Sequence, residues 1–278
     1  MNSINKIYNL IFSKVNSLRY YIKEKILYTA VKHKSFQILK KKNPLISIIM
    51  PTYNRSKILS EIGLPSVLNQ TYKNFELIIV SDGSTDNTEE VVKKIDDKRI
   101  KFYKIIRKKR YPPSLGNHWA SHSVVPTNFG LKKINGDWIA HIDDDDIWTE
   151  DHLEKLLNFA VKNKYEFVSS SHTEIRYEKE TIKDYSNYTP AIGAHKTWLY
   201  TANLVFFERN INCWRRTWNR IHDVDAQDRM TKVGLNFGYI KDVTYTAKPR
   251  PGENEIGITA IRKNEEYYKK KYKFVKTI

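Results

Sequence analysis

The central part of the chain alternates between short, continuous apolar runs and longer segments with helical spacing of apolar residues. Continuous apolar runs predict strands that are covered on both faces, and the spaced segments predict helices. The predicted strands are 45–50, 75–80, 100–105 and 137–142, and the predicted helices between them are 57–70, 89–97 and 128–136. This alternation predicts an α/β fold, with a mostly parallel sheet flanked by helices on both faces.

Both ends of the chain differ from this central pattern because they are strongly basic. Residues 4–39 have the apolar spacing of a helix with lysines on its other faces, and Pro44 ends it. Residues 1–43 carry ten basic side chains against Glu24, and residues 261–278 carry seven against two glutamates. A basic amphipathic helix can lie on an anionic membrane surface. The alternative is a helical hairpin that packs on the domain with a solvated lysine face.

Composition narrows the class of protein. The 278 residues suffice for one large α/β domain with extensions or for two small domains, and the 40% hydrophobic content supports a packed core. Cys213 is the only cysteine, which excludes an intramolecular disulfide and suits a reducing compartment. We see neither an apolar run of membrane-spanning length nor the pattern of a signal peptide. We therefore expect a cytoplasmic protein, with peripheral contact to the inner face of the plasma membrane as an option.

Four consecutive carboxylates, Asp143 to Asp146, follow the last predicted strand in the stretch HIDDDDIW. Neighbouring carboxylates ionise together only if a counter-charge is present. Ligand sets made of oxygen atoms suit Mn²⁺ or Mg²⁺. In an extended segment Asp143 and Asp145 share one side and Asp144 and Asp146 the other. The alternative is a solvated acidic turn before a helix that Thr149 caps.

Polar residues also follow two of the other predicted strands. Residues 51–54 follow the first strand, and Asp82 follows the second. Loops at the carboxyl ends of parallel strands meet at one edge of the sheet, where ligands bind. Tyr53 offers a flat face for a nucleobase, and Asp82 offers an acceptor for a base N–H or a ribose hydroxyl. A core tyrosine and a simple turn residue are the alternatives.

Three stretches in this order and spacing, SIIMPTYNR, SVLNQTYKNFELIIVSDGSTDNT and GDWIAHIDDDDIW, resemble family 2 glycosyltransferases of the Rossmann-like GT-A fold. The resemblance covers about residues 45–160. It implies an inverting enzyme with a nucleotide-sugar donor at the strand ends and a metal on a D-x-D signature. It also implies a nucleotide-sugar-binding half (44–148) and an acceptor-binding half (149–260) between the basic extensions 1–43 and 261–278.

The resemblance also implies roles for individual residues. The implied nucleotide contacts are Pro51, Thr52, Tyr53, Asn54 and Asp82, with Asp143 and Asp144 beside the ribose and the metal and Asp145 as the principal metal ligand.

The second half of the chain matches the family less closely. The stretch HDVDAQDRM resembles the family's acidic segment, which implies Asp223 as the general base and Asp225 as its alternative. The other interpretation is a helix start with an exposed acidic face. His222 replaces the usual glutamate, and Thr127 replaces an arginine that helps to hold the diphosphate. Candidates for the missing positive charge are Arg107, Lys108, Lys109, Arg110, His118 and His122. Near residue 245, where the resemblance implies a further phosphate contact, the chain offers Lys248 and Arg250.

These observations predict a metal-dependent, inverting glycosyltransferase. We expect it to move a sugar from a nucleotide-diphosphate donor, with UDP favoured, to a glycan or lipid-linked acceptor in bacterial cell-surface polysaccharide synthesis. The alternatives are a metal-dependent nucleotidyltransferase and a non-catalytic, glycosyltransferase-like binding protein. The net charge of +17 would also suit a nucleic-acid-binding protein. We expect no nucleic acid, because the strongest motif is acidic and would repel a phosphate backbone.

Overall fold

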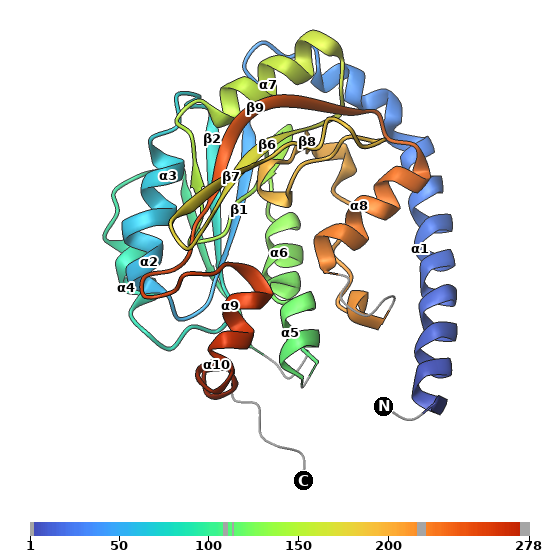
Figure 1. Cartoon of the computed structure of the whole chain (residues 1–278). Coiled ribbons are helices and arrows are strands. Elements are labelled where there is room, and N and C mark those ends of the chain that lie inside the picture. The colour runs from blue at the N-terminus through green and yellow to red at the C-terminus, as the bar shows by residue number, and fades with distance from the viewer. Residues whose placement is uncertain (1–2, 108–110, 113, 216–220, 273–278) are drawn as a thin grey trace.

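The computed structural model describes residues 3–107, 111–112, 114–215 and 221–272. The strands are β1 (Ile46–Thr52), β2 (Phe75–Ser81), β3 (Ile100–Lys104), β4 (Trp138–His141), β5 (Ile147–Trp148), β6 (Phe167–Arg176), β7 (Lys179–Lys183), β8 (Leu199–Thr201) and β9 (Phe237–Ala247). In this described part of the chain they form a nine-stranded sheet with the order β3-β2-β1-β4-β8-β6-β9-β5, and β7 pairs with β6 (Figure 1).

The two halves of the sheet differ in strand direction. β3, β2, β1 and β4 are all parallel. β8 is antiparallel to both β4 and β6, β6 is parallel to β9, and β5 is antiparallel to β9. The predicted parallel α/β sheet is therefore confirmed for the first half, and the second half is mixed. Because the parallel strands put their carboxyl ends at one edge, the loops after β1, β2 and β4 meet there.

Helices cover both faces of the sheet (Figure 1). They are α1 (Ser3–Ile38), α2 (Ser56–Ile58), the π-helical turn η1 (Leu59–Gly63), α3 (Leu64–Leu68), α4 (Thr88–Lys93), α5 (Leu115–Ser121), α6 (Val124–Leu131), α7 (His152–Asn163), α8 (His222–Val233), α9 (Gly257–Lys263), α10 (Glu265–Lys271) and the 3₁₀ turns η2 (His195–Thr197), η3 (Ala202–Leu204) and η4 (Cys213–Arg215).

The core has two parts, one on each side of the sheet, because successive strand residues point to opposite faces. Ile48 and Met50 of β1 pack with apolar residues of η1, α3, α4 and α7. Ile49, between them in β1, packs on the other side with residues of α6, β8 and α8. Both faces are covered, which explains why β1 reads as a continuous apolar run.

The basic N-terminal segment forms one continuous helix, α1, of 36 residues. It packs against α8, η3 and η4. The face toward the domain carries buried polar side chains: Glu24 is buried against Arg229, and the hydroxyl of buried Ser35 donates to Glu166 at 2.8 Å. Seven apolar side chains point outward and are 50–64% exposed: Ile7, Leu10, Ile11, Val15, Leu18, Ile22 and Ile26. We call these seven residues the outer stripe.

No helix among the described residues, α1 included, has a stretch long and apolar enough to cross a bilayer. The N-terminal end of α1 lies at the same end of the molecule as α5 and α10 (Figure 1).

Candidate active site

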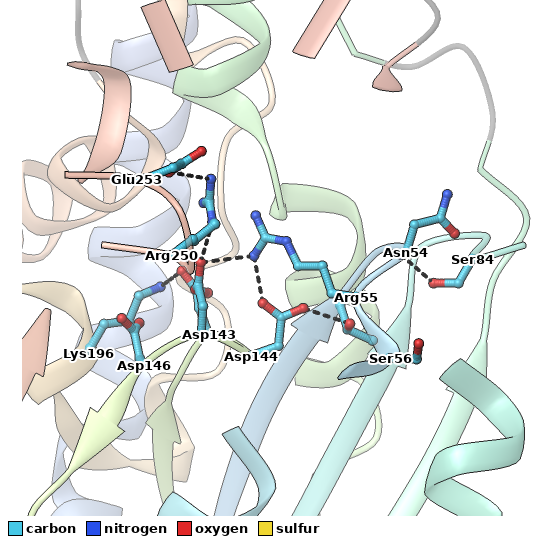
Figure 2. A network of polar contacts seen from close by, with 12 residues as sticks. Asn54, Arg55, Ser56, Ser84, Asp143, Asp144, Asp146, Lys196, Arg250 and Glu253 are labelled. Carbon is cyan, nitrogen blue, oxygen red and sulfur yellow. Dashed lines mark hydrogen bonds and ion pairs between the residues drawn. The ribbon is translucent and has the colours of Figure 1, made fainter. Parts of the chain in front are cut away.

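The loops that follow β1, β2 and β4 are joined by hydrogen bonds. The hydroxyl of Thr52, the last residue of β1, donates to Asp144 Oδ2 at 2.7 Å. The Asn54 backbone N–H donates to the Ser84 hydroxyl at 3.0 Å, as Figure 2 shows. The Ser56 N–H donates to Asp86 at 3.0 Å. The predicted meeting of three polar loops at one edge of the sheet is therefore confirmed.

Three of the four consecutive aspartates point to one place, and the fourth, Asp144, points elsewhere. Asp143, Asp145 and Asp146 each place a carboxylate oxygen within 4.8 Å of the others, whereas Asp144 points to the β1 loop. The prediction that Asp143 and Asp145 share a side is correct. The prediction that Asp146 joins Asp144 is wrong, because a turn at residues 144–145 breaks the strand alternation. Three carboxylates without nitrogen or sulfur ligands fit Mn²⁺ or Mg²⁺.

Three cationic side chains lie against these carboxylates (Figure 2). Arg55 contacts Asp144 at 2.6 Å and Asp145 at 3.2 Å. Arg250 donates to Asp145 at 2.7 Å, and the Lys196 ammonium lies 2.5 Å from Asp143. Arg250 was among the predicted phosphate contacts, whereas Arg55 and Lys196 were not predicted.

Burial and these cations act in opposite directions on the pKa values of the aspartates. Burial on its own would raise the pKa of Asp145, but Arg55 and Arg250 outweigh it and hold that pKa below its usual range. Burial raises the pKa of Asp146, and the charges of Asp143 and Asp145 raise it further. Asp145 is thus more readily ionised than Asp146, which suits a metal ligand.

A cavity of about 80 Å³ lies beside the aspartates and is lined by the predicted nucleotide contacts Pro51, Thr52, Tyr53, Asp82, Asp143 and Asp144. Arg107 also lines the cavity: its guanidinium lies 4.1 Å from the centre of the Tyr53 ring and is ion-paired with Asp82. Tyr272 lines it too and stacks with Tyr53, with ring centroids 6.4 Å apart. Tyr272 carries no sequence signal for this position, since it lies in the basic C-terminal segment.

Asn54 is placed differently from its loop neighbours. Its side-chain oxygen accepts from the Thr85 N–H at 2.7 Å, and the residue does not line the cavity. Its φ of 50° lies in the left-handed region, which asparagine tolerates better than most residues. Asn54 therefore shapes the loop that carries Tyr53.

Asp223 and Asp225 face opposite sides of α8. Asp223 lies in the first turn and lines a cavity of about 360 Å³ together with Asp143, Asp145 and Lys196. Burial raises the pKa of Asp223, and Lys196 partly opposes this. Asp225 is fully buried and accepts from Arg229 at 2.9 Å on the side of α8 that meets α1. The alternative interpretation of an exposed acidic face does not hold for Asp225.

The other predicted candidates for the missing positive charge lie in different places. His118 lines the cavity of about 80 Å³, Lys248 lines the cavity of about 360 Å³, and His122 lines both. Lys108, Lys109 and Arg110 lie outside the described residues. Thr127, at the position of the expected arginine, is buried in α6.

Comparison with known proteins identifies the class. The profile described as glycosyl transferase family 2 matches residues 47–226, and the chain belongs to this family of glycosyltransferases. Its similarity to an uncharacterized glycosyltransferase of Haemophilus influenzae is 39% identity over 142 residues, 50% of this chain and 52% of the relative.

The Escherichia coli protein WfgD, named a UDP-Glc:alpha-D-GlcNAc-diphosphoundecaprenol beta-1,3-glucosyltransferase, is 38% identical over 45% of this chain and 44% of its own length. The chain thus spans about half the length of these curated relatives.

Solved structures support the GT-A fold. Staphylococcus aureus TarS 1–349 in complex with UDP-GlcNAc superposes with a TM-score of 0.59 at 19% identity, over 75% of this chain and 60% of TarS. The mannosyltransferase PcManGT from Pyrobaculum calidifontis, in complex with GDP-Man and Mn²⁺, gives 0.51 at 17% identity, over 87% and 70% of the two chains. At this level of identity the likeness establishes the fold.

Proposed function

We propose that this glycosyltransferase is metal-dependent and inverting, and that it transfers a sugar from a UDP-sugar to a lipid-linked glycan during synthesis of a bacterial cell-surface polysaccharide. One observation carries the proposal: Asp143, Asp145 and Asp146 gather beside Arg55, Arg250 and Lys196, across a cavity from Asp223. The UDP-GlcNAc complex of TarS and the UDP-Glc named for WfgD support the choice of nucleotide.

We assign the nucleotide end of the donor to the smaller cavity, which at about 80 Å³ must widen by movement of Arg107 and Tyr272 to admit it. Tyr53 presents its ring to the base, and Asp82 accepts a base N–H once Arg107 gives up its ion pair with that carboxylate. Asp144, fixed by Thr52 and Arg55, lies where the ribose follows. The nucleotide half of the site is thus built from loops that the sheet holds in place.

The diphosphate fits next to the cations. Arg55, Arg250 and Lys196 are already at this place and can donate to phosphate oxygens. Asp145 and Asp143, with Asp146 beside them, would hold a divalent cation, which supplies positive charge against the negative charge that grows on the leaving diphosphate. Each of these cations is paired with one of the aspartates, so it would exchange that carboxylate for a phosphate oxygen when the metal-bound donor enters.

Asp223 is the general base in this proposal. It faces the same cavity as Asp143 and Asp145, whereas Asp225 is paired with Arg229 on the opposite side of α8. Asp223 removes the proton from the acceptor hydroxyl as the oxygen attacks the anomeric carbon. A single displacement of this kind inverts the configuration at that carbon.

The outer stripe supports a membrane-bound acceptor. Seven apolar side chains along α1 face outward, and the exposed Lys14, Lys25 and Lys32 lie on the same side of the helix by helical geometry. Apolar side chains that insert below basic residues favour an anionic bilayer surface. We place the enzyme at the inner face of the plasma membrane, where an acceptor like the one named for WfgD would be found.

The donor assignment is tested with a panel of nucleotide sugars and Mn²⁺. A ligand that binds the native state raises the apparent melting temperature. We expect a UDP-sugar with Mn²⁺ to stabilise the protein more than either component by itself, and EDTA to cancel the effect. If every nucleotide sugar leaves the melting temperature unchanged, the proposal is wrong.

The membrane assignment is tested by flotation with phosphatidylglycerol vesicles. The triple variant Ile11→Ser, Leu18→Ser and Ile22→Ser removes the middle of the outer stripe and keeps every lysine. We expect wild-type protein to float with the vesicles and the triple variant to stay in solution. The matched control, Ile182→Ser, changes a 64% exposed isoleucine on β7 and should float like wild type. Equal flotation of the triple variant would contradict the assignment.

A further inference from the structure

A further cavity, of about 760 Å³, adjoins the cavity of about 360 Å³ that Asp223 lines together with Asp143 and Asp145. The two share part of their lining: Ala194, His195, Ile221 and Asp223 border both. Asp223 therefore lies at the junction. A molecule in the further cavity can bring a hydroxyl group to Asp223 from the side opposite the aspartates that face the donor.

The walls of the further cavity combine a polar helix face with tyrosine rings. On α8, Thr231 follows Gln227 by four residues and Asp228 by three, so the three side chains share one face of the helix. Tyr185 and Tyr188, from the segment after β7, line the cavity as well, and Tyr188 is 66% exposed. We call this cavity the α8 groove.

This combination suits a sugar. The C–H face of a pyranose ring is apolar and packs on an aromatic ring, and its hydroxyl groups exchange hydrogen bonds with amide and carboxylate oxygens. Gln227 and Asp228 offer such oxygens, and Tyr185 and Tyr188 offer the rings. The volume lies within the usual range for a small-molecule site.

The charge of the α8 groove separates it from the donor site. Among the described residues that line it, Lys232 is the single lysine or arginine, whereas three cations surround the aspartates of the donor site. The nearby His195 is neutral, because its Nε2 accepts from Arg209 at 2.7 Å and burial keeps its pKa low. The lining also includes the carboxylates Asp223 and Asp228, which favour an uncharged glycan over a diphosphate.

The length of the groove sets the size of the ligand. Asp223 and Lys232 are nine residues apart on α8, which corresponds to about 14 Å along the helix axis. This exceeds a single pyranose ring. The groove therefore has room for the acceptor's terminal sugar and part of the next one.

We propose that the α8 groove binds the glycan of the acceptor, with the terminal sugar between α8 and Tyr188 and its reacting hydroxyl at Asp223. This assignment rests on the proposed function, because it takes Asp223 as the base. It makes Gln227 and Tyr188 specificity-determining residues that contact the acceptor and not the donor.

The test compares two steps of the same enzyme. Release of UDP from the UDP-sugar without an acceptor reports on the donor site, and transfer to octyl glycosides of glucose, galactose and N-acetylglucosamine reports on the groove. In Gln227→Ala and Tyr188→Ala we expect the KM for the octyl glycoside to rise about tenfold, as the loss of one hydrogen bond or ring contact implies. UDP release without acceptor should stay unchanged in both variants.

The matched control is Tyr177→Ala, which removes a 55% exposed tyrosine from the turn between β6 and β7, outside the groove. Its KM for the glycoside should equal that of wild type. An unchanged KM in both groove variants, or equal loss of UDP release and transfer, would overturn the assignment. Absence of UDP release from wild-type enzyme with every donor would instead count against the proposed function.

Discussion

Individual residues of the site differ in how much the sequence reveals of them. The aspartates after β4 and the residues after β1 and β2 could be predicted, because parallel strands end at one edge of a sheet. The sequence could not show that Asp146 joins Asp143 and Asp145, since that depends on the turn at residues 144–145. A run of four aspartates fixes the charge of a loop but not the direction of each side chain.

The cations of the site also differ in how much the sequence reveals of them. Arg55 directly follows the predicted nucleotide loop, so its position in PTYNR was a usable signal. Lys196 lies in the turn η2, 53 residues after Asp143, and belongs to no pattern that periodicity can detect. Only the folded chain brings the two together.

The pH dependence of Asp223 gives a prediction at this scale. A general base must be deprotonated, and burial raises the pKa of Asp223. We expect kcat/KM to fall as the pH drops through a pKa above the usual aspartate value of about 3.8. Asp223→Asn should bind the donor normally, lose about 10²–10⁴-fold in kcat, and lack this acid limb. A transfer rate near wild type in Asp223→Asn would contradict the role.

At the scale of elements, α8 connects the site to α1. One side of α8 carries Asp223 and the groove residues, and the other carries Asp225 and Arg229. Arg229 also pairs with Glu24 of α1, and all three side chains are buried. The helix that positions the candidate base is therefore held by a buried ionic triad.

Replacing Arg229 by methionine tests this triad. It leaves Glu24 and Asp225 buried together without their cation, and breaking such a pair costs about 3–5 kcal/mol of unfolding free energy. Burial already raises the pKa of Glu24 and Arg229 opposes this, so without Arg229 the pKa of Glu24 in the folded state should lie still further above its unfolded value. Protonation then favours the folded state, and the loss of stability shrinks as the pH falls.

Urea unfolding at pH 8 and pH 5 measures this. We expect Arg229→Met to be less stable than wild type at both values, with the larger deficit at pH 8. Lys232→Met, an exposed position on the same helix, serves as the control and should change little. A deficit that is negligible, or that grows toward pH 5, would show that the triad does not hold α8 to α1.

The elements themselves were predicted unequally. Strands β1 to β4 follow apolar runs and α1 follows helical spacing, so the sequence predicts them. The sequence did not predict β6 and β9, although they have 10 and 11 residues, and β5 and β8 have only two and three. The orientation of α1 was also hidden. An apolar stripe usually marks the face toward the core, but here buried Glu24 and Ser35 lie on the inner face and the seven residues of the outer stripe point outward.

At the scale of the whole molecule, positive and negative charges are concentrated in different parts of the chain. The chain is +17 overall, with much of the excess in the two ends, while the loops after β4 concentrate negative charge. The donor site, the α8 groove and α1 follow one another across the fold, since α8 borders the groove and packs against α1. A membrane-bound α1 would thus hold the groove near the acceptor.

The central claim is that Asp145 binds the donor's diphosphate through a divalent cation, and titration calorimetry tests it most directly. Wild-type protein and Asp145→Asn are titrated with the best-stabilising UDP-sugar, with Mn²⁺ and with EDTA. We predict binding by wild type that needs Mn²⁺ and that weakens at least about tenfold in Asp145→Asn, a difference of about 1.4 kcal/mol. Equal affinity of the two proteins, or binding by wild type that persists in EDTA, would contradict the claim.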